Sequence, residues 1–172
     1  MSGAIEQKAG SARPLHPMVV HFPLALLALS TAADLAFFFL KIESLRHTGW
    51  WSLAGAAVGG ALAVAAGLFD MRRASLNEEV HARVHRHMKV GLVLLAAITA
   101  LTFWRWTVFL DTSAHVSAVY LDCAILVMAL AMFQGWLGGE LVYSDGVFVS
   151  HEKPRAGVKP QVPAKGKGGH HD

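Results

Sequence analysis

The sequence predicts an all-α protein, an antiparallel bundle of four transmembrane helices with a disordered polar tail at each end. Hydrophobic residues make up 54% of the 172 residues and charged residues only 16%, whereas soluble domains usually carry about 25% charged residues. A helix needs roughly 20 predominantly apolar residues to cross a bilayer. Four segments reach that length: Met18–Leu40, Trp50–Phe69, Met88–Leu110 and Val116–Leu137. The chain therefore divides into an N-terminal tail (1–15), one membrane domain (16–149) and a basic C-terminal tail (150–172).

The first span follows a polar N-terminal stretch and is too long for the apolar region of a signal peptide. Pro23 lacks a backbone N–H and is expected to kink the start of this span. The connection to the second span, Lys41–Gly49, is short. The first two spans are therefore expected to be antiparallel neighbours.

The connection between the second and third spans, Asp70–His87, is longer and has its own helix signals. Ser75 precedes Asn77 and Glu78, an order typical of a helix N-terminus. We expect a short helix at the membrane surface that abuts or merges with the third span.

The fourth span follows the short connection Asp111–His115. Gly135, Gly138 and Gly139 are expected to end its helix, so that residues 141–149 run as extended chain along the membrane surface. The Gly-, Pro- and Lys-rich segment after it has the composition of a disordered tail.

Lysine and arginine are distributed unevenly between the two sides of the predicted bundle. Eleven of the 15 lie in the two tails and the connection between the second and third spans, which share one side, and Lys89 at the adjoining start of the third span makes twelve. Cytoplasmic segments carry the excess of positive charge. The sequence therefore predicts a bacterial inner-membrane protein with both termini in the cytoplasm. This bias also explains the basic pI without a nucleic-acid partner, and it favours contact with anionic lipid.

Besides Lys89 at the very start of the third span, three charged residues fall within the spans. Asp34 and Arg105 are both predicted near the outer ends of their helices, and pairing them would relieve two buried charges. Asp122 lies about 12 Å inside the fourth span and is expected to be protonated or hydrogen-bonded. Its candidate partners are Tyr120, Thr99 and Thr102.

Two histidines at the ends of spans are the strongest candidates for holding a cofactor. An ionisable group at membrane depth is costly and therefore suggests a function. His21 lies in the first turns of the first span above a stripe of alanines, and His87 opens the third span on the same side. Two imidazoles from different helices can hold a haem iron. The sequence predicts one haem b with His21 and His87 as axial ligands and His16 as a substitute; structural hydrogen bonding is the alternative.

A second pair of histidines, His81 and His85, is spaced to share one helix face. That spacing suits a metal such as zinc or copper when a third ligand is present. No glutamate lies between the two histidines, which argues against an HExxH metalloprotease, and Arg83 and Arg86 make the surroundings electropositive. A solvated basic face over the lipid headgroups is therefore the favoured interpretation, and a metal site at His81 and His85 is the alternative.

Glycine pairs on two spans point to close helix packing. Gly55 and Gly59 form a GxxxG pair on the second span, and Gly135 and Gly139 form another on the fourth. Small residues let helices approach closely in lipid. Packing within the bundle is favoured, and a homo-oligomer is the alternative.

Several of these motifs together resemble a family of bacterial predicted membrane proteins, domain of unknown function 2231. The matching pieces are HPMVVHFP (16–23), GLFD (67–70), His87 and GGELVY (138–143), so the resemblance covers about residues 15–149. The family's activity is unassigned, and related domains attached to redox modules favour electron transfer. The segments after His87 and Asp70 depart from the family pattern, in which an asparagine and an aromatic residue often follow.

Three functions remain open from the sequence. The first is a haem b electron-transfer subunit that serves a quinone or a redox partner protein. The second is a metal-handling protein that uses His16, His81, His85 and His151. The third is an accessory or scaffold subunit that docks through its glycine faces. A non-catalytic role is favoured over an enzyme, because the sequence contains no catalytic triad, phosphate-binding loop or glycosidase carboxylate pair.

Overall fold

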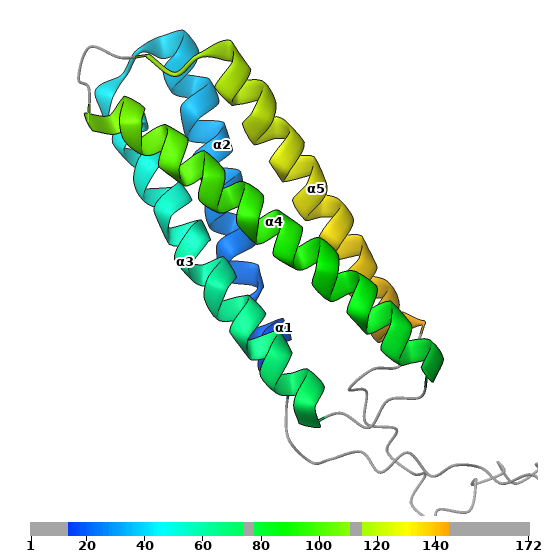
Figure 1. Cartoon of the computed structure of the whole chain (residues 1–172). Helices are drawn as coiled ribbons and strands as arrows, with labels where there is room; N and C mark the ends of the chain where they lie inside the picture. Colours follow the sequence, from blue (N-terminus) through cyan, green and yellow to red (C-terminus); the bar gives the residue numbers. More distant parts are fainter. Residues whose placement is uncertain (1–13, 74–77, 111–114, 145–172) are drawn as a thin grey trace, which may run out of the picture.

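The computed structural model describes residues 14–73, 78–110 and 115–144 (Figure 1). Its helices are α1 (His16–Val19), α2 (His21–Leu40), α3 (Glu43–Arg73), α4 (Glu78–Leu110) and α5 (Ala118–Tyr143). Because α1 and α2 together make one span, the helices form four rods, each long and apolar enough to cross a membrane. The predicted all-α bundle of four antiparallel membrane helices is confirmed. Most of the two predicted tails, and the helix signal at Ser75, lie outside the described residues.

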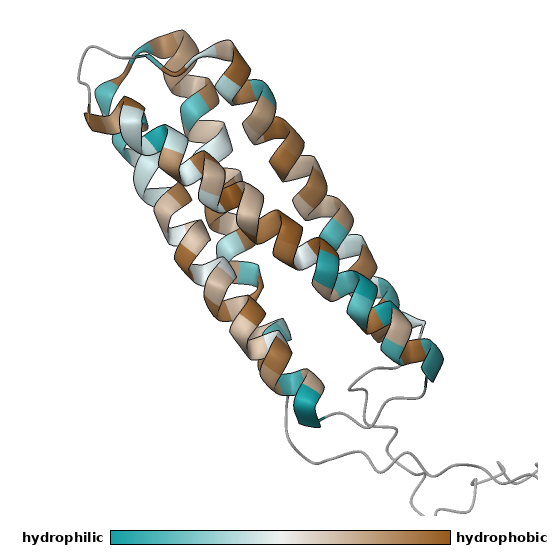
Figure 2. Ribbon diagram, viewed as in Figure 1, coloured by the Kyte–Doolittle hydropathy of each residue, from teal (hydrophilic) through white to brown (hydrophobic). Residues whose placement is uncertain are grey.

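Each rod packs against the next, and α5 returns to pack against α2, so the bundle closes on itself (Figure 1). One end holds α1, the C-terminal turns of α3, the N-terminal turns of α4 and the end of α5. Figure 2 shows hydrophobic residues along the middle of the rods and hydrophilic residues gathered where α3 ends and α4 begins. We call this end, which carries His16, Asp70, His87 and Gln134, the histidine end.

The helices are longer than the apolar segments that predicted them. Most of the predicted connection 41–49 belongs to α3, and the predicted surface helix is continuous with α4. The prediction that glycines end the last helix is wrong, because α5 runs through them to Tyr143. Leu137 and Leu141 are both buried on that stretch. Their packing against the bundle outweighs the cost of glycine within a helix.

The first rod is interrupted at Val20, between α1 and α2. Pro23 has no N–H to donate to the carbonyl one turn earlier, and the next bond, from Leu24 N to Val20 O, is long at 3.5 Å. The expected disturbance near Pro23 therefore appears as a break that separates the single turn of α1 from the long α2.

The first glycine pair packs α3 against α2 within the chain. A Cβ atom added to Gly59 would lie 3.3 Å from Pro23, and one added to Gly55 would lie 3.0 Å from Leu26. A Cβ at Gly135 would meet no atom within 4 Å, so the second pair faces outward. The prediction of packing within the bundle is confirmed for the first pair only.

Asp34, Arg105 and Tyr120 form a buried cluster at the opposite end, which we call the ion-pair end. Arg105 donates from Nη2 to Asp34 Oδ1 at 2.9 Å, and Tyr120 donates its hydroxyl to Asp34 Oδ2 at 3.1 Å. Arg105 also donates to the carbonyl of Arg46 at 3.0 Å. The predicted Asp34–Arg105 pair is confirmed. The cluster joins all four rods, from α2, α3, α4 and α5.

The prediction that Asp122 pairs with Tyr120, Thr99 or Thr102 is wrong. Tyr120 is bound to Asp34 instead. Both threonines donate to carbonyls one turn back in their own helix, at 2.8 Å. The Asp122 side chain is exposed on the outer surface of α5.

Replacing Gly49 with alanine is expected to destabilise the protein by about 1–3 kcal/mol, the usual cost of overpacking a core. The new Cβ would overlap the carboxylate of Asp34, which Arg105 and Tyr120 hold in place. Thermal unfolding in detergent, followed by circular dichroism, measures the effect. Gly135→Ala is the matched control, because the space around Gly135 is open. Equal melting temperatures for the two variants would contradict the prediction.

Candidate functional site

His16 and His87 meet at the histidine end, although 71 positions separate them in the sequence. His16 opens α1, and His87 lies in the third turn of α4. Their ring centroids are 5.9 Å apart, and the ring planes are perpendicular at 90°. Both residues are half-buried, so the bundle partly encloses the pair.

The end of α3 fixes the orientation of His16. The backbone N–H of His16 donates to Asp70 Oδ2 at 2.8 Å, which ties α1 to α3. The ring Nδ1 lies 2.7 Å from the carbonyl oxygen of Ala63. A carbonyl can only accept, so Nδ1 carries the proton and Nε2 carries the lone pair. Gly67, one turn further along α3, leaves room for the ring, since a Cβ there would lie 3.1 Å from Nδ1.

His87 is held from the side of α5. The side-chain amide nitrogen of Gln134 lies 2.9 Å from the carbonyl oxygen of His87 and 3.2 Å from its ring Nε2. Gly138 follows Gln134 by one turn and allows the ring to approach α5, because a Cβ there would lie 3.1 Å from Cε1 of His87. Gln134 therefore contacts both the ring and the backbone of His87, at a point where α4 and α5 pack closely together.

His21, the ligand expected from the sequence together with His87, does not join this pair. Its side chain is exposed, as are those of Ala25 and Ala32 below it. His16 faces into the bundle, where its ring contacts Ala63 on α3, whereas His21, beyond the break at Val20, faces outward. The structure brings together His87 and the substitute ligand, His16.

Three residues of this site were missed from the sequence: Ala63, Asp70 as a contact of His16, and Gln134. Asp70 and Gln134 carried a signal, because each is polar and adjoins or interrupts an apolar span. Ala63 contributes only a backbone carbonyl. No side-chain pattern could have identified it.

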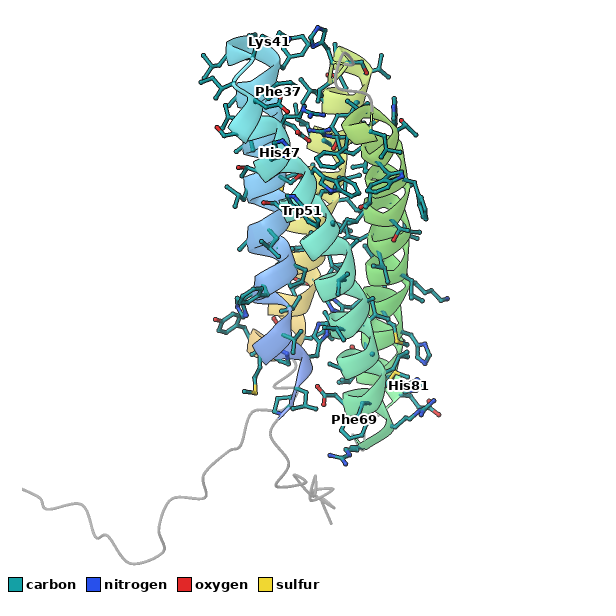
Figure 3. All side chains as sticks on the ribbon, turned by 90° about the vertical axis from the view of Figure 1, so that its left-hand side faces the viewer. Phe37, Lys41, His47, Trp51, Phe69 and His81 are labelled. Atoms are coloured by element: carbon teal, nitrogen blue, oxygen red, sulfur yellow. The ribbon has the colours of Figure 1, made fainter. Side chains whose placement is uncertain are left out.

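His81 and His85 lie one turn apart near the start of α4, with ring centroids 4.4 Å apart. Figure 3 shows His81 at the same end of the bundle as Phe69 and at the opposite end from Lys41. Within residues 14–73, 78–110 and 115–144, no group of three or more His, Cys, Asp or Glu side chains is arranged to hold a metal ion. Metal binding at this pair stays a prediction, and His151 lies outside the described residues.

Charged side chains of both signs lie at the histidine end, beside a small pocket. A pocket of about 120 Å³ opens between α4 and α5, close in sequence to His87 and Gly138. It is lined by Arg83, Arg86, Leu137, Glu140 and Leu141. Its lining therefore combines two arginines, one carboxylate and two leucines, and Arg83 is ion-paired with Glu79 at 2.6 Å.

Comparison with known protein families identifies a family for this chain. The family model described as predicted membrane protein (DUF2231) matches residues 12–151. This range takes in all four rods and every residue of the pair at the histidine end. No curated protein and no solved structure matches the chain.

Proposed function

The chain belongs to the DUF2231 family of predicted membrane proteins, and we propose that it is an electron-transfer protein that binds one haem b through His16 and His87. The four apolar rods fit an integral membrane protein. The proposal adds a cofactor and a role to this description. It keeps His87 as a ligand and replaces His21 with His16, because His16 is the histidine beside His87.

The close approach of the His16 and His87 rings is the observation that carries the proposal. A metal–nitrogen distance of about 2 Å places two imidazole centres about 6 Å apart when they bind one metal from opposite sides. The observed ring separation is 5.9 Å. Metal-ligating histidines usually donate their other ring N–H to a carbonyl or carboxylate, and His16 does so to Ala63. Its Nε2 is therefore prepared as a ligand.

The pocket between α4 and α5 supplies further groups for the proposal. Arg86 would pair with a propionate group there, and Leu137 and Leu141 line the same pocket together with Glu140. When bound, haem supplies one-electron redox chemistry, and the residues around the iron set its potential. The role of this chain is to present two imidazoles, exclude water and hold the acidic groups.

We also propose that the histidine end faces the bacterial cytoplasm, across the inner membrane from the ion-pair end. The excess of Lys and Arg at this end supports this orientation. A quinone in the bilayer or a soluble redox protein at the basic surface would then be the electron partner. A homo-oligomer could form through the outward-facing pair Gly135 and Gly139.

An absorption spectrum of the protein purified in detergent, after expression with haem supplied, tests the proposed function. A Soret band, with α and β bands that sharpen on reduction by dithionite, is expected for a low-spin haem with two histidine ligands. A colourless protein would overturn the proposal. Bound zinc or copper that is lost from a His81→Ala/His85→Ala variant would then support metal handling, and a co-purifying partner would support a scaffold.

A further inference from the structure

The amide of Gln134 can lie in only one orientation in the observed contact with His87. The carbonyl oxygen of His87 is an acceptor, so the group 2.9 Å from it must be the amide nitrogen and not the amide oxygen. The same nitrogen lies 3.2 Å from Nε2 of the His87 ring. Its two hydrogens therefore serve the carbonyl and the ring.

This orientation dictates the tautomer of His87. Because Nε2 accepts a hydrogen bond from the amide, the neutral ring must carry its proton on Nδ1. Among the described residues, neither Nδ1 of His87 nor Oε1 of Gln134 has a hydrogen-bond partner, and both atoms are buried. Unpaired buried polar atoms are costly, so the contact is incomplete as a purely structural one.

Rotating the Gln134 amide by a half-turn would favour the other tautomer of His87, with the proton on Nε2. Oε1 of Gln134 would then accept the proton of Nε2–H, and Nδ1 of His87 would offer its lone pair. The turned arrangement gives up the bond to the His87 carbonyl, so a ligand at Nδ1 is needed to favour it. Binding at the imidazole and turning of the amide are therefore coupled.

We infer that Gln134 is a positioning residue that sets the tautomer of His87 and so selects the ring nitrogen that a ligand at the His16–His87 pair can use. The identity of that ligand as haem rests on the proposed function, whereas the control of the tautomer does not. When a histidine binds a metal through one ring nitrogen, the hydrogen-bond partner of the other ring nitrogen fixes its tautomer and ring orientation.

Gly91 and Gly138 have no side chain and so leave the space that the Gln134 amide and the His87 ring occupy. A Cβ at Gly91 would lie 2.9 Å from the amide nitrogen of Gln134, so alanine there would displace the amide. A Cβ at Gly138 would lie 3.1 Å from Cε1 of His87. Gly91→Ala thus disturbs the contact through the flexible end of one side chain, without removing any polar group.

Nitrogen NMR of the His87 ring in the haem-free protein tests this inference. The wild type is expected to show the proton on Nδ1. Gln134→Met removes the donor to Nε2 and is expected to move most of the population to the Nε2–H tautomer. Gly91→Ala is expected to move it part of the way, and it serves alone if Gln134→Met fails to fold. Gly135→Ala, whose new Cβ meets no atom within 4 Å, is the control and should match the wild type.

An unchanged tautomer in a folded Gln134→Met or Gly91→Ala variant would overturn the inference, whatever the haem spectrum shows. A colourless wild type with the expected change of tautomer would instead overturn only the proposed function. Where haem binds, the reduction potential of Gln134→Met should also differ from that of Gly135→Ala. Equal potentials would count against Gln134 as a positioning residue.

Discussion

Replacing Asp34 with alanine is expected to lower the free energy of unfolding by about 3–5 kcal/mol, the range for removing one partner of a buried ion pair. Arg105 would keep its charge with 0% of its surface exposed and no carboxylate beside it. Tyr120 would also lose its acceptor. Because this cluster joins all four rods, the loss should be felt as global unfolding in a denaturation series in detergent micelles.

Two further variants separate the charge from general damage to the helices. Asp122→Ala removes an exposed carboxylate from α5 and is expected to change stability by no more than about 0.5 kcal/mol. The double variant Asp34→Leu/Arg105→Met removes both charges together, and such replacements are often neutral or stabilising. It should therefore recover most of the loss. If Asp34→Ala costs no more than Asp122→Ala, the buried pair does not hold the rods together.

The features that the sequence predicted correctly are those that depend on local composition. Four apolar stretches near the length of a bilayer predict four rods, because that length is a property of each segment alone. The Asp34–Arg105 pair was also predictable. Two opposite charges at similar depth in different spans are costly to bury singly, so they are expected to pair with each other.

The features that the sequence did not predict depend on how each helix is rotated. His16 and His21 lie in one motif, and their spacing alone does not show which of them faces the bundle. The contacts of His16 with Ala63 and Asp70, on a different rod, settle that choice. The role of Gln134 depends on tertiary packing, because it arises only when α5 packs beside His87. The end of α5 depends on packing for a similar reason, since buried Leu137 and Leu141 extend the helix past its glycines.

The second large effect that we expect concerns haem binding. His87→Ala and His16→Ala should each lose haem, whereas His21→Ala should retain it. Removing either imidazole of the proposed pair takes away an axial ligand, so the Soret absorbance per chain should fall to a small fraction of the wild-type value, or shift to a high-spin spectrum. His21 is exposed and lies outside the pair, so its replacement should leave the spectrum unchanged.

The comparison among the three histidine variants discriminates between the two possible ligand pairs. His16→Ala keeps the backbone N–H that donates to Asp70, so the fold of α1 should persist, and circular dichroism in detergent can verify it. The absorbance of each folded variant is then read against its protein concentration. Retention of haem by His16→Ala together with loss from His21→Ala would contradict the structural assignment. In that case the first turns of the first rod would have to rotate on binding, bringing His21 toward His87 and breaking the contact of His16 with Ala63.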